Sequence, residues 1–248
     1  MDDDVPSRWG LPLRRVEEQE KEPLPRGTWP GTLAPVRQVL DEGLDLGPAT
    51  VLVGANGAGK STLVEGIATA FGLPAGGGTG NTRHWEDRSA DLSPLAGSLR
   101  LVRGAGASRW GYFLRAETMH TLFGDLVERS SGRTDRRLMS HGESFLDVLD
   151  DHFDDSGLFL LDEPESALSF ESQLALVGVL AAQVSTGRAQ VVVATHSPLV
   201  AALPGARLLE VSERGLEEVA WEDLDVVRHW RSFLDAPERY LRHVRPGG

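Results

Sequence analysis

Three short apolar runs divide the chain, and each one ends directly in glycine or polar residues. The runs are Ala49–Val53, Leu158–Leu161 and Val191–Ala194. Apolar runs of this length, rich in valine and leucine, are typical of strands that are buried on both faces of a parallel sheet. The pattern therefore predicts three core strands.

Helical periodicity occupies the segments next to these runs. After the first run, Leu63, Ile67 and Phe71 recur at helical spacing until Pro74 ends the helix. A second helix is predicted over residues 169–184, between the last two runs. Strands that alternate with helices predict an α/β fold with a mainly parallel sheet flanked by helices.

The remaining segments carry weaker patterns. Leu99–Arg103 and Gly111–Arg115 predict two strands of a hairpin, joined by the turn-like sequence GAGAS. Residues 116–129 predict a helix, and the tail over 222–244 predicts an amphipathic helix that follows the apolar segment Leu208–Val211.

Domain organisation follows from these patterns. Residues 1–26 are rich in charge and proline and lack a clear period, so we expect a mobile or loosely attached lead-in. Residues 27–248 are expected to form one domain, in which residues 75–150 contribute a small antiparallel and helical insertion lobe.

Composition excludes several classes of protein. The chain has 248 residues, a formal net charge of −12 and no cysteine, which excludes disulfides and thiolate chemistry and disfavours general attraction to nucleic acid. The N-terminus lacks the apolar core of a signal peptide, and the longest apolar run, Leu174–Ala182, is too short to span a membrane. We expect a cytoplasmic protein without direct membrane insertion.

The first apolar run leads into a segment that matches G-x-x-x-x-G-K-[ST] at every fixed position. The segment is Gly54, Ala55, Asn56, Gly57, Ala58, Gly59, Lys60 and Ser61, and Thr62 follows it. Glycines let backbone N–H groups wrap a phosphate, and the next helix N-terminus favours an anion. In such a loop Lys60 contacts the β- and γ-phosphates, and the Ser61 hydroxyl ligates Mg²⁺. A glycine-rich turn that binds nothing is the alternative, but the flanking strand and helix favour a nucleotide site.

Two carboxylates follow the second run, and a histidine follows the third. Asp162 can hold Mg²⁺, and Glu163 can orient and deprotonate an attacking water. His196 can donate a hydrogen bond to the γ-phosphate or position the water. The alternatives are a solvated acidic turn and a structural histidine. No guanine-reading N/TKxD element occurs in the expected region, which favours ATP as the nucleotide.

The segment Ser140-His141-Gly142-Glu143-Ser144 precedes another apolar run. Ser140 and Glu143 have the spacing of a capping box, so a well-capped helix start is one interpretation. The same segment also offers N–H groups, a hydroxyl and a positive helix end to an anion.

Taken in order, GANGAGKST, SHGES, LLDEPESALS and THSP resemble the nucleotide-binding cassette of the ABC-ATPase superfamily. The resemblance covers most of residues 30–212. It implies a P-loop NTPase fold in which Gly54–Ser61 is Walker A, Ser140–Ser144 the signature, Leu158–Glu163 Walker B and His196 the switch histidine. It further implies that the signature closes in trans over ATP bound by a second subunit, in an ATP-dependent homodimer.

The branch of the superfamily is indicated by departures from the transporter pattern. SHGES replaces LSGGQ, and no glutamine occurs between residues 61 and 140. These features resemble the SMC-like, non-transport branch, and most of all small stand-alone bacterial ATPases of the AAA type. We expect Mg²⁺-dependent ATP hydrolysis that acts on an unidentified protein or nucleic-acid partner. The alternative is the ATP-binding subunit of an ABC transporter whose membrane domain is a separate chain.

Overall fold

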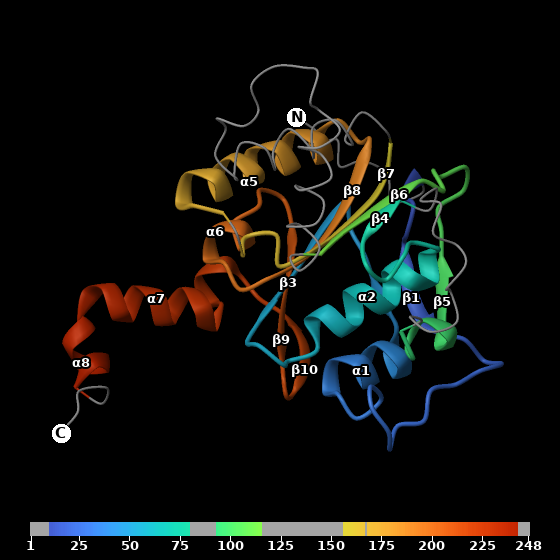
Figure 1. Ribbon diagram of the computed structural model, residues 1–248, viewed down its shortest axis with the longest axis horizontal. Helices are drawn as coiled ribbons and strands as arrows, with labels where there is room; N and C mark the ends of the chain where they lie inside the picture. The colour runs from blue at the N-terminus through green and yellow to red at the C-terminus, as the bar shows by residue number, and fades with distance from the viewer. Residues whose placement is uncertain (1–9, 80–92, 116–155, 167, 243–248) are drawn as a thin grey trace.

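The computed structural model describes residues 10–79, 93–115, 156–166 and 168–242 (Figure 1). Its centre is a seven-stranded sheet in the order β10-β9-β3-β8-β7-β6-β4. The strands are β3 (Ala49–Gly54), β4 (Gly78–Thr79), β6 (Gly111–Arg115), β7 (Gly157–Asp162), β8 (Ala189–Thr195), β9 (Arg207–Ser212) and β10 (Gly215–Glu218). The five inner strands pair in parallel, and the two edge strands are antiparallel.

The three apolar runs form the neighbouring strands β3, β8 and β7, as predicted. Val53 lies opposite Thr195 in the register of β3 and β8, and Asp162 lies opposite Ala194 in that of β7 and β8. The carboxyl ends of these strands therefore meet at one edge of the sheet, where ligands bind in open α/β folds.

Helices cover both faces of the sheet. The longer helices are α1 (Ala34–Glu42), α2 (Lys60–Phe71), α5 (Phe170–Ser185) and α7 (Asp225–Asp235), and the shorter ones are α6 (Pro198–Ala201), α8 (Pro237–Leu241) and the 3-10 turns η3 (Ala96–Ser98) and η5 (Trp221–Asp223). One apolar core joins α1 and α2 to one face, and a second core joins α5 and α6 to the other (Figure 1). The helices predicted after the first run and over 169–184 are thus confirmed as α2 and α5.

A second, three-stranded antiparallel sheet lies beyond α1 and α2. It has the order β2-β1-β5, with β1 (Arg15–Glu18), β2 (Leu44–Asp45) and β5 (Leu99–Val102). The expectation of a loosely attached lead-in over residues 1–26 is therefore wrong for its described part. β1 is the central strand of this sheet, and Leu13 and Val16 are fully buried. Residues 1–9 lie outside the described residues.

The predicted hairpin over residues 99–115 is also wrong. Both strands exist, but β5 pairs with β1 in the small sheet, whereas β6 pairs with β7 and β4 in the large one. Each strand pairs with a strand distant in the sequence, so the turn-like GAGAS connects two sheets. The helix predicted over 116–129 lies outside the described residues.

The tail continues as η5, α7 and α8, which confirms its predicted helical character for the described residues, up to residue 242. Figure 1 shows α7 and α8 extending away from the sheet, and the exposed large apolar side chains of this arm include Trp230 and Leu234. Within the described ranges, none of the helices has the length and apolar character needed to cross a membrane.

Candidate functional site

The phosphate loop joins β3 to α2. Gly57 and Gly59 have φ angles of 78° and 103°, which side chains rarely adopt, so glycine is required at both positions. Gly59 is the N-cap of α2, and Lys60 and Ser61 open the helix. The loop therefore has the strand–loop–helix context in which backbone N–H groups and a helix N-terminus bind phosphate. Thr62 lies in the first turn of the same helix.

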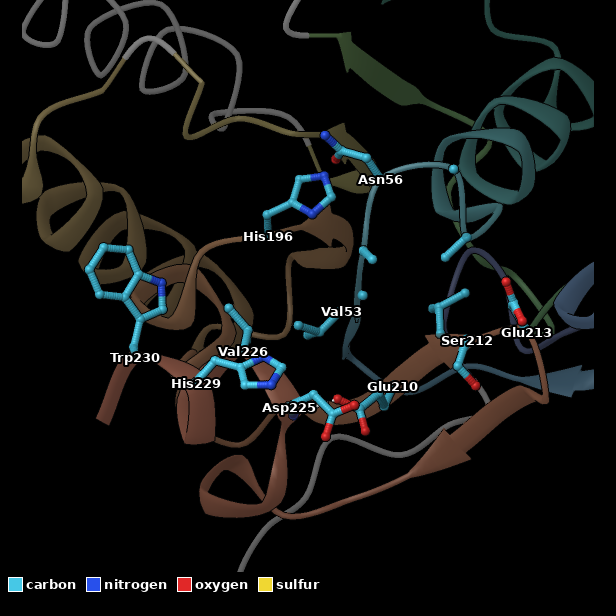
Figure 2. A pocket seen from close by; sticks show the side chains of 15 residues that line it. Val53, Asn56, His196, Glu210, Ser212, Glu213, Asp225, Val226, His229 and Trp230 are labelled. Carbon is cyan, nitrogen blue, oxygen red and sulfur yellow. Dashed lines mark hydrogen bonds between the residues drawn. The ribbon is translucent and has the colours of Figure 1, made fainter. Parts of the chain in front are cut away.

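A cleft of about 550 Å³ adjoins the loop (Figure 2). One wall is formed by residues 53–58 and His196, and the other by the end of β9 and one side of α7. Asp225, Val226, His229 and Trp230 are the residues of α7 that line it. The sequence patterns did not point to α7 as a wall, because its amphipathic spacing says nothing about which element it faces.

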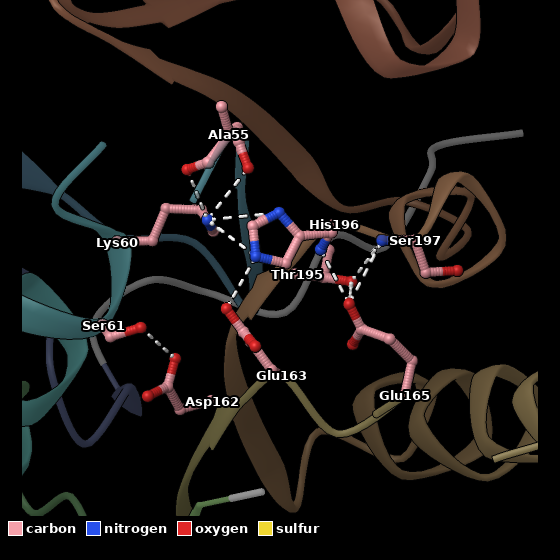
Figure 3. A network of polar contacts seen from close by, with 10 residues as sticks. Ala55, Lys60, Ser61, Asp162, Glu163, Glu165, Thr195, His196 and Ser197 are labelled. Carbon is pink, nitrogen blue, oxygen red and sulfur yellow. Dashed lines mark hydrogen bonds and ion pairs between the residues drawn. The ribbon is translucent and has the colours of Figure 1, made fainter. Parts of the chain in front are cut away.

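The Lys60 ammonium lies inside the phosphate loop (Figure 3). Its Nζ donates to the carbonyl oxygens of Gly54 at 2.9 Å and Ala55 at 3.0 Å, and it lies 3.2 Å from Nε2 of His196. Burial lowers the pKa of Lys60, while the nearby carboxylates of Glu163 and Asp162 act to raise it. A cation held in this way can neutralise the charge of a phosphate.

Ser61 and Asp162 form the candidate Mg²⁺ ligands. The Ser61 hydroxyl donates to Oδ1 of Asp162 at 2.9 Å, which links the start of α2 to the end of β7. Burial raises the pKa of Asp162 to about 6, and the hydrogen bond from Ser61 offsets only part of that effect. A buried carboxylate beside a hydroxyl suits a hard cation that prefers oxygen ligands, so these residues fit Mg²⁺.

Glu163 adopts a backbone conformation unusual for its residue type. Its φ is 51°, and it is the one non-glycine residue with positive φ among the described residues. Such strain persists only where the surroundings hold it and is frequent at functional sites. The conformation is held in part by its backbone N–H, which donates to the carbonyl of Ala194 at 2.9 Å, and its side chain points to His196 (Figure 3).

His196 links the candidate base to the phosphate loop. Its Nε2 lies 2.6 Å from Oε1 of Glu163, and its ring also contacts the Lys60 ammonium. A proton on Nε2 donates to the Glu163 carboxylate and leaves Nδ1 as the acceptor. Three predicted site residues from separate segments thus lie together at one sheet edge: Lys60, Glu163 and His196. Lys60 and His196 are 136 positions apart in the sequence.

Two further residues of the site were missed by sequence reasoning. Glu165 and Thr195 hydrogen-bond to each other at 2.6 Å, and Glu165 also accepts backbone N–H groups of His196 and Ser197. The DEPE sequence shows Glu165 as a third carboxylate. Its role could not be predicted from the sequence, because its hydrogen-bond partners follow a different strand.

The predicted signature residues Ser140, His141, Gly142 and Glu143 lie outside the described residues. Their proposed contact with a second subunit therefore stays a prediction.

A family model described as "AAA domain, putative AbiEii toxin, Type IV TA system" matches residues 145–202. None of the curated proteins matches the sequence. Among solved structures, the SMC head domain from Thermotoga maritima is 15% identical, with 85% of this chain and 100% of that chain covered and a TM-score of 0.49. A metal-chelate type ABC transporter in an inward-facing conformation is 17% identical, with 73% and 76% covered and a TM-score of 0.45.

The family match includes Asp162, Glu163 and His196. The phosphate loop precedes it, on a mostly parallel seven-stranded sheet. The chain is therefore a mixed α/β protein whose fold, phosphate loop and matched segment are consistent with an ABC-ATPase-like cassette.

Proposed function

We propose that this protein hydrolyses the β–γ phosphoanhydride of ATP with Mg²⁺, and that two copies enclose two ATP molecules. The single observation that carries the proposal is the convergence of Lys60, the Ser61–Asp162 pair and the Glu163–His196 pair at one sheet edge. Phosphate binding, a cation site and a base beside a histidine are what phosphoryl transfer to water requires.

Each of these residues has a distinct role in the proposed reaction. Lys60 and the loop N–H groups bind the phosphates, and Ser61 and Asp162 hold Mg²⁺, which neutralises phosphate charge when bound. Glu163 accepts a proton from the attacking water. The water oxygen bonds to the γ-phosphorus as the bond between the γ-phosphorus and the β–γ bridging oxygen breaks, which leaves ADP and phosphate. His196 hydrogen-bonds the γ-phosphate or the water.

The signature residues extend the proposal to a dimer. Ser140 and Gly142 of one copy would contact the γ-phosphate held by the other, so hydrolysis would release the two copies. The resulting motion would act on a protein or nucleic-acid partner.

The variant Glu163→Gln tests the role of the base. Glutamine keeps the size of the side chain but cannot accept the proton, so we expect ATP binding within about twofold of the unsubstituted protein and turnover reduced by about 10²-fold or more. Turnover is measured as phosphate release, and binding by equilibrium titration with a fluorescent ATP analogue. Glu171→Gln, an exposed glutamate in the first turn of α5, is the matched control. Equal turnover by Glu163→Gln and the control would contradict the assignment.

The same variant tests the dimer. In light scattering with Mg-ATP, Glu163→Gln should have twice the 26.9 kDa mass of one chain, and without nucleotide it should be a monomer. Lys60→Ala, which loses the phosphate-binding ammonium, should stay monomeric under both conditions. An unchanged mass of Glu163→Gln with ATP shown to be bound would refute the enclosed dimer and leave the ATPase proposal standing.

A further inference from the structure

A single carboxylate oxygen holds the loop that carries His196. Oε1 of Glu165 accepts the Thr195 hydroxyl at 2.6 Å, the backbone N–H of His196 at 2.7 Å and that of Ser197 at 3.2 Å (Figure 3). Three consecutive residues at the end of β8 therefore donate to one acceptor.

Glu165 belongs to the turn that follows β7, so its contacts join two functional loops. The turn is closed by Ser166, which donates its N–H to the carbonyl of Glu163 at 3.1 Å, and by Leu168, which donates to the carbonyl of Glu165 at 2.9 Å. The position of Glu165 is thus coupled to that of the candidate base two residues before it.

Gln173 of α5 makes a second connection between the same loops. Its Oε1 accepts the Ser197 hydroxyl at 2.6 Å, and its Nε2 donates to the carbonyl of Leu168 at 3.1 Å. These contacts reach Ser197, which caps α6, but not His196 itself. Of Glu165 and Gln173, Glu165 is therefore the one that hydrogen-bonds directly to His196, through its backbone N–H.

We infer that Glu165 is a positioning residue for catalysis, which fixes the backbone of His196 so that its ring stands between Lys60 and Glu163. The inference rests on the proposed ATP hydrolysis and deepens it. Three hydrogen bonds to one acceptor atom fix the position of their donors, so this one residue can restrict the His196 backbone. The imidazole would then need no rearrangement as the attacking water and γ-phosphate react.

The identity of the acceptor gives the inference a testable signature. Glu165→Asp keeps the charge but draws the oxygen back by one carbon, and Glu165→Ala removes it. We expect kcat to fall about tenfold or more in both. KM for ATP should change less than about threefold, because the hydrogen bonds of Glu165 go to residues 195–197 and its effect on the pKa of Lys60 is the smallest of the three carboxylate effects there. Glu165→Gln keeps an oxygen at the required distance and should retain kcat within about threefold.

Glu165→Gln should nevertheless unfold at a lower temperature. The second oxygen, Oε2, is buried without a hydrogen-bond partner among the described residues, and glutamine would place an NH₂ group there. Retained kcat together with reduced stability would separate a positioning role from a purely structural one. The Asp and Gln variants carry the test if the Ala variant does not fold.

A double-mutant cycle identifies the residue through which Glu165 acts. If its effect passes through His196, Glu165→Ala should reduce kcat less than about twofold when introduced into His196→Ala. Glu171→Ala, which removes an exposed carboxylate six residues further along the chain, is the matched control and should leave kcat unchanged in both backgrounds.

The outcomes distinguish a failure of the proposed ATP hydrolysis from a failure of the role inferred for Glu165. An unsubstituted protein that binds Mg-ATP but does not turn it over would overturn the proposed function and this inference with it. If the unsubstituted protein is active, a normal kcat in Glu165→Asp would overturn the inference alone. The same holds if Glu165→Ala reduces kcat by the same factor in the His196→Ala and unsubstituted backgrounds.

Discussion

At the scale of single residues, Asp162 is held in an environment that disfavours its charge. The side chain is 6% exposed, and burial raises its pKa to about 6. Without a cation, the ionised carboxylate therefore costs folding free energy at neutral pH. A cation bound to it would recover this free energy, so the proposed Mg²⁺ site predicts that cation affinity and stability are linked at this position.

This linkage predicts a pH dependence of stability in EDTA. Because the folded pKa lies above the unfolded one, the contribution of Asp162 is present at low pH and is lost as pH rises from about 4 to 6. Asp162→Asn removes the charge, so its stability advantage should grow from near zero at pH 4 to on the order of 2 kcal/mol at pH 7.5. Urea denaturation at both pH values measures it, and a pH-independent difference would contradict the linkage.

The proximity of the candidate site residues could be predicted because each belongs to an ordered motif. Lys60, Ser61, Asp162, Glu163 and His196 all lie at the sheet edge where the motif order places them. The contact between Glu165 and Thr195 could not be predicted, because it depends on how closely the loops after β7 and β8 approach each other. No local sequence pattern encodes the distance between those loops.

At the scale of secondary-structure elements, the start of β7 shows how closely the strands approach. A Cβ added to Gly157 would lie 2.5 Å from the backbone oxygen of Trp110. The ring of Trp110 packs at 5.2 Å from that of Phe159, which sits in the same strand as Gly157. A side chain at Gly157 would therefore displace the backbone before β6 as well as an aromatic contact.

Gly157→Ala should destabilise the protein by about 2 kcal/mol or more, seen as a fall in Tm of roughly 5 °C. Gly178→Ala is the matched control, because Gly178 is exposed on α5 and a Cβ there meets nothing within 4 Å. Its higher helix propensity should stabilise by about 0.5–1 kcal/mol. Thermal melting that moves in the same direction for both variants would contradict this account.

Elements with a strong local signal were predictable, whereas their partners were not. The runs that became β3, β7 and β8 are apolar on both faces, which suits only an inner strand of a covered sheet. β5 and β6 carry no such signal about pairing. Their assignment to different sheets was decided by competition from β1 and β7, strands distant in sequence.

At the scale of the whole molecule, one glutamine connects the N-terminal segment to the main sheet. Gln190 is the second residue of β8 and is 1% exposed. Its Oε1 accepts the N–H of Leu13 at 2.8 Å, and its Nε2 donates to the carbonyls of Leu13 at 2.6 Å and Gly47 at 2.9 Å. Three backbone groups from two loops are thus satisfied by a single side chain.

Gln190→Ala should destabilise the protein by about 2–4 kcal/mol, because three buried backbone groups lose their partner. Urea denaturation gives the free energy of unfolding, and Gln183→Ala on α5 is a control expected within about 0.5 kcal/mol of the unsubstituted protein. A loss below about 1 kcal/mol would mean that water satisfies these groups in the variant.

The attachment of residues 10–26 was hidden from sequence reasoning for the same reason. The segment is charged and rich in proline, yet Leu13 and Val16 are fully buried, and the Leu13 backbone is bonded to a residue 177 positions away. Composition averages over such a segment, whereas its few buried apolar side chains and one distant glutamine determine where it packs.

The contacts among Lys60, His196 and Glu163 have a consequence for selectivity. Each of these groups has a partner within the chain. Under the proposed function, an incoming nucleotide would compete with those partners, so the measured affinity would be the difference between two sets of contacts. ADP lacks the γ-phosphate that His196 is proposed to contact, so it would displace fewer of them. Discrimination between ATP and ADP would then be set in part by the protein's own internal pairing.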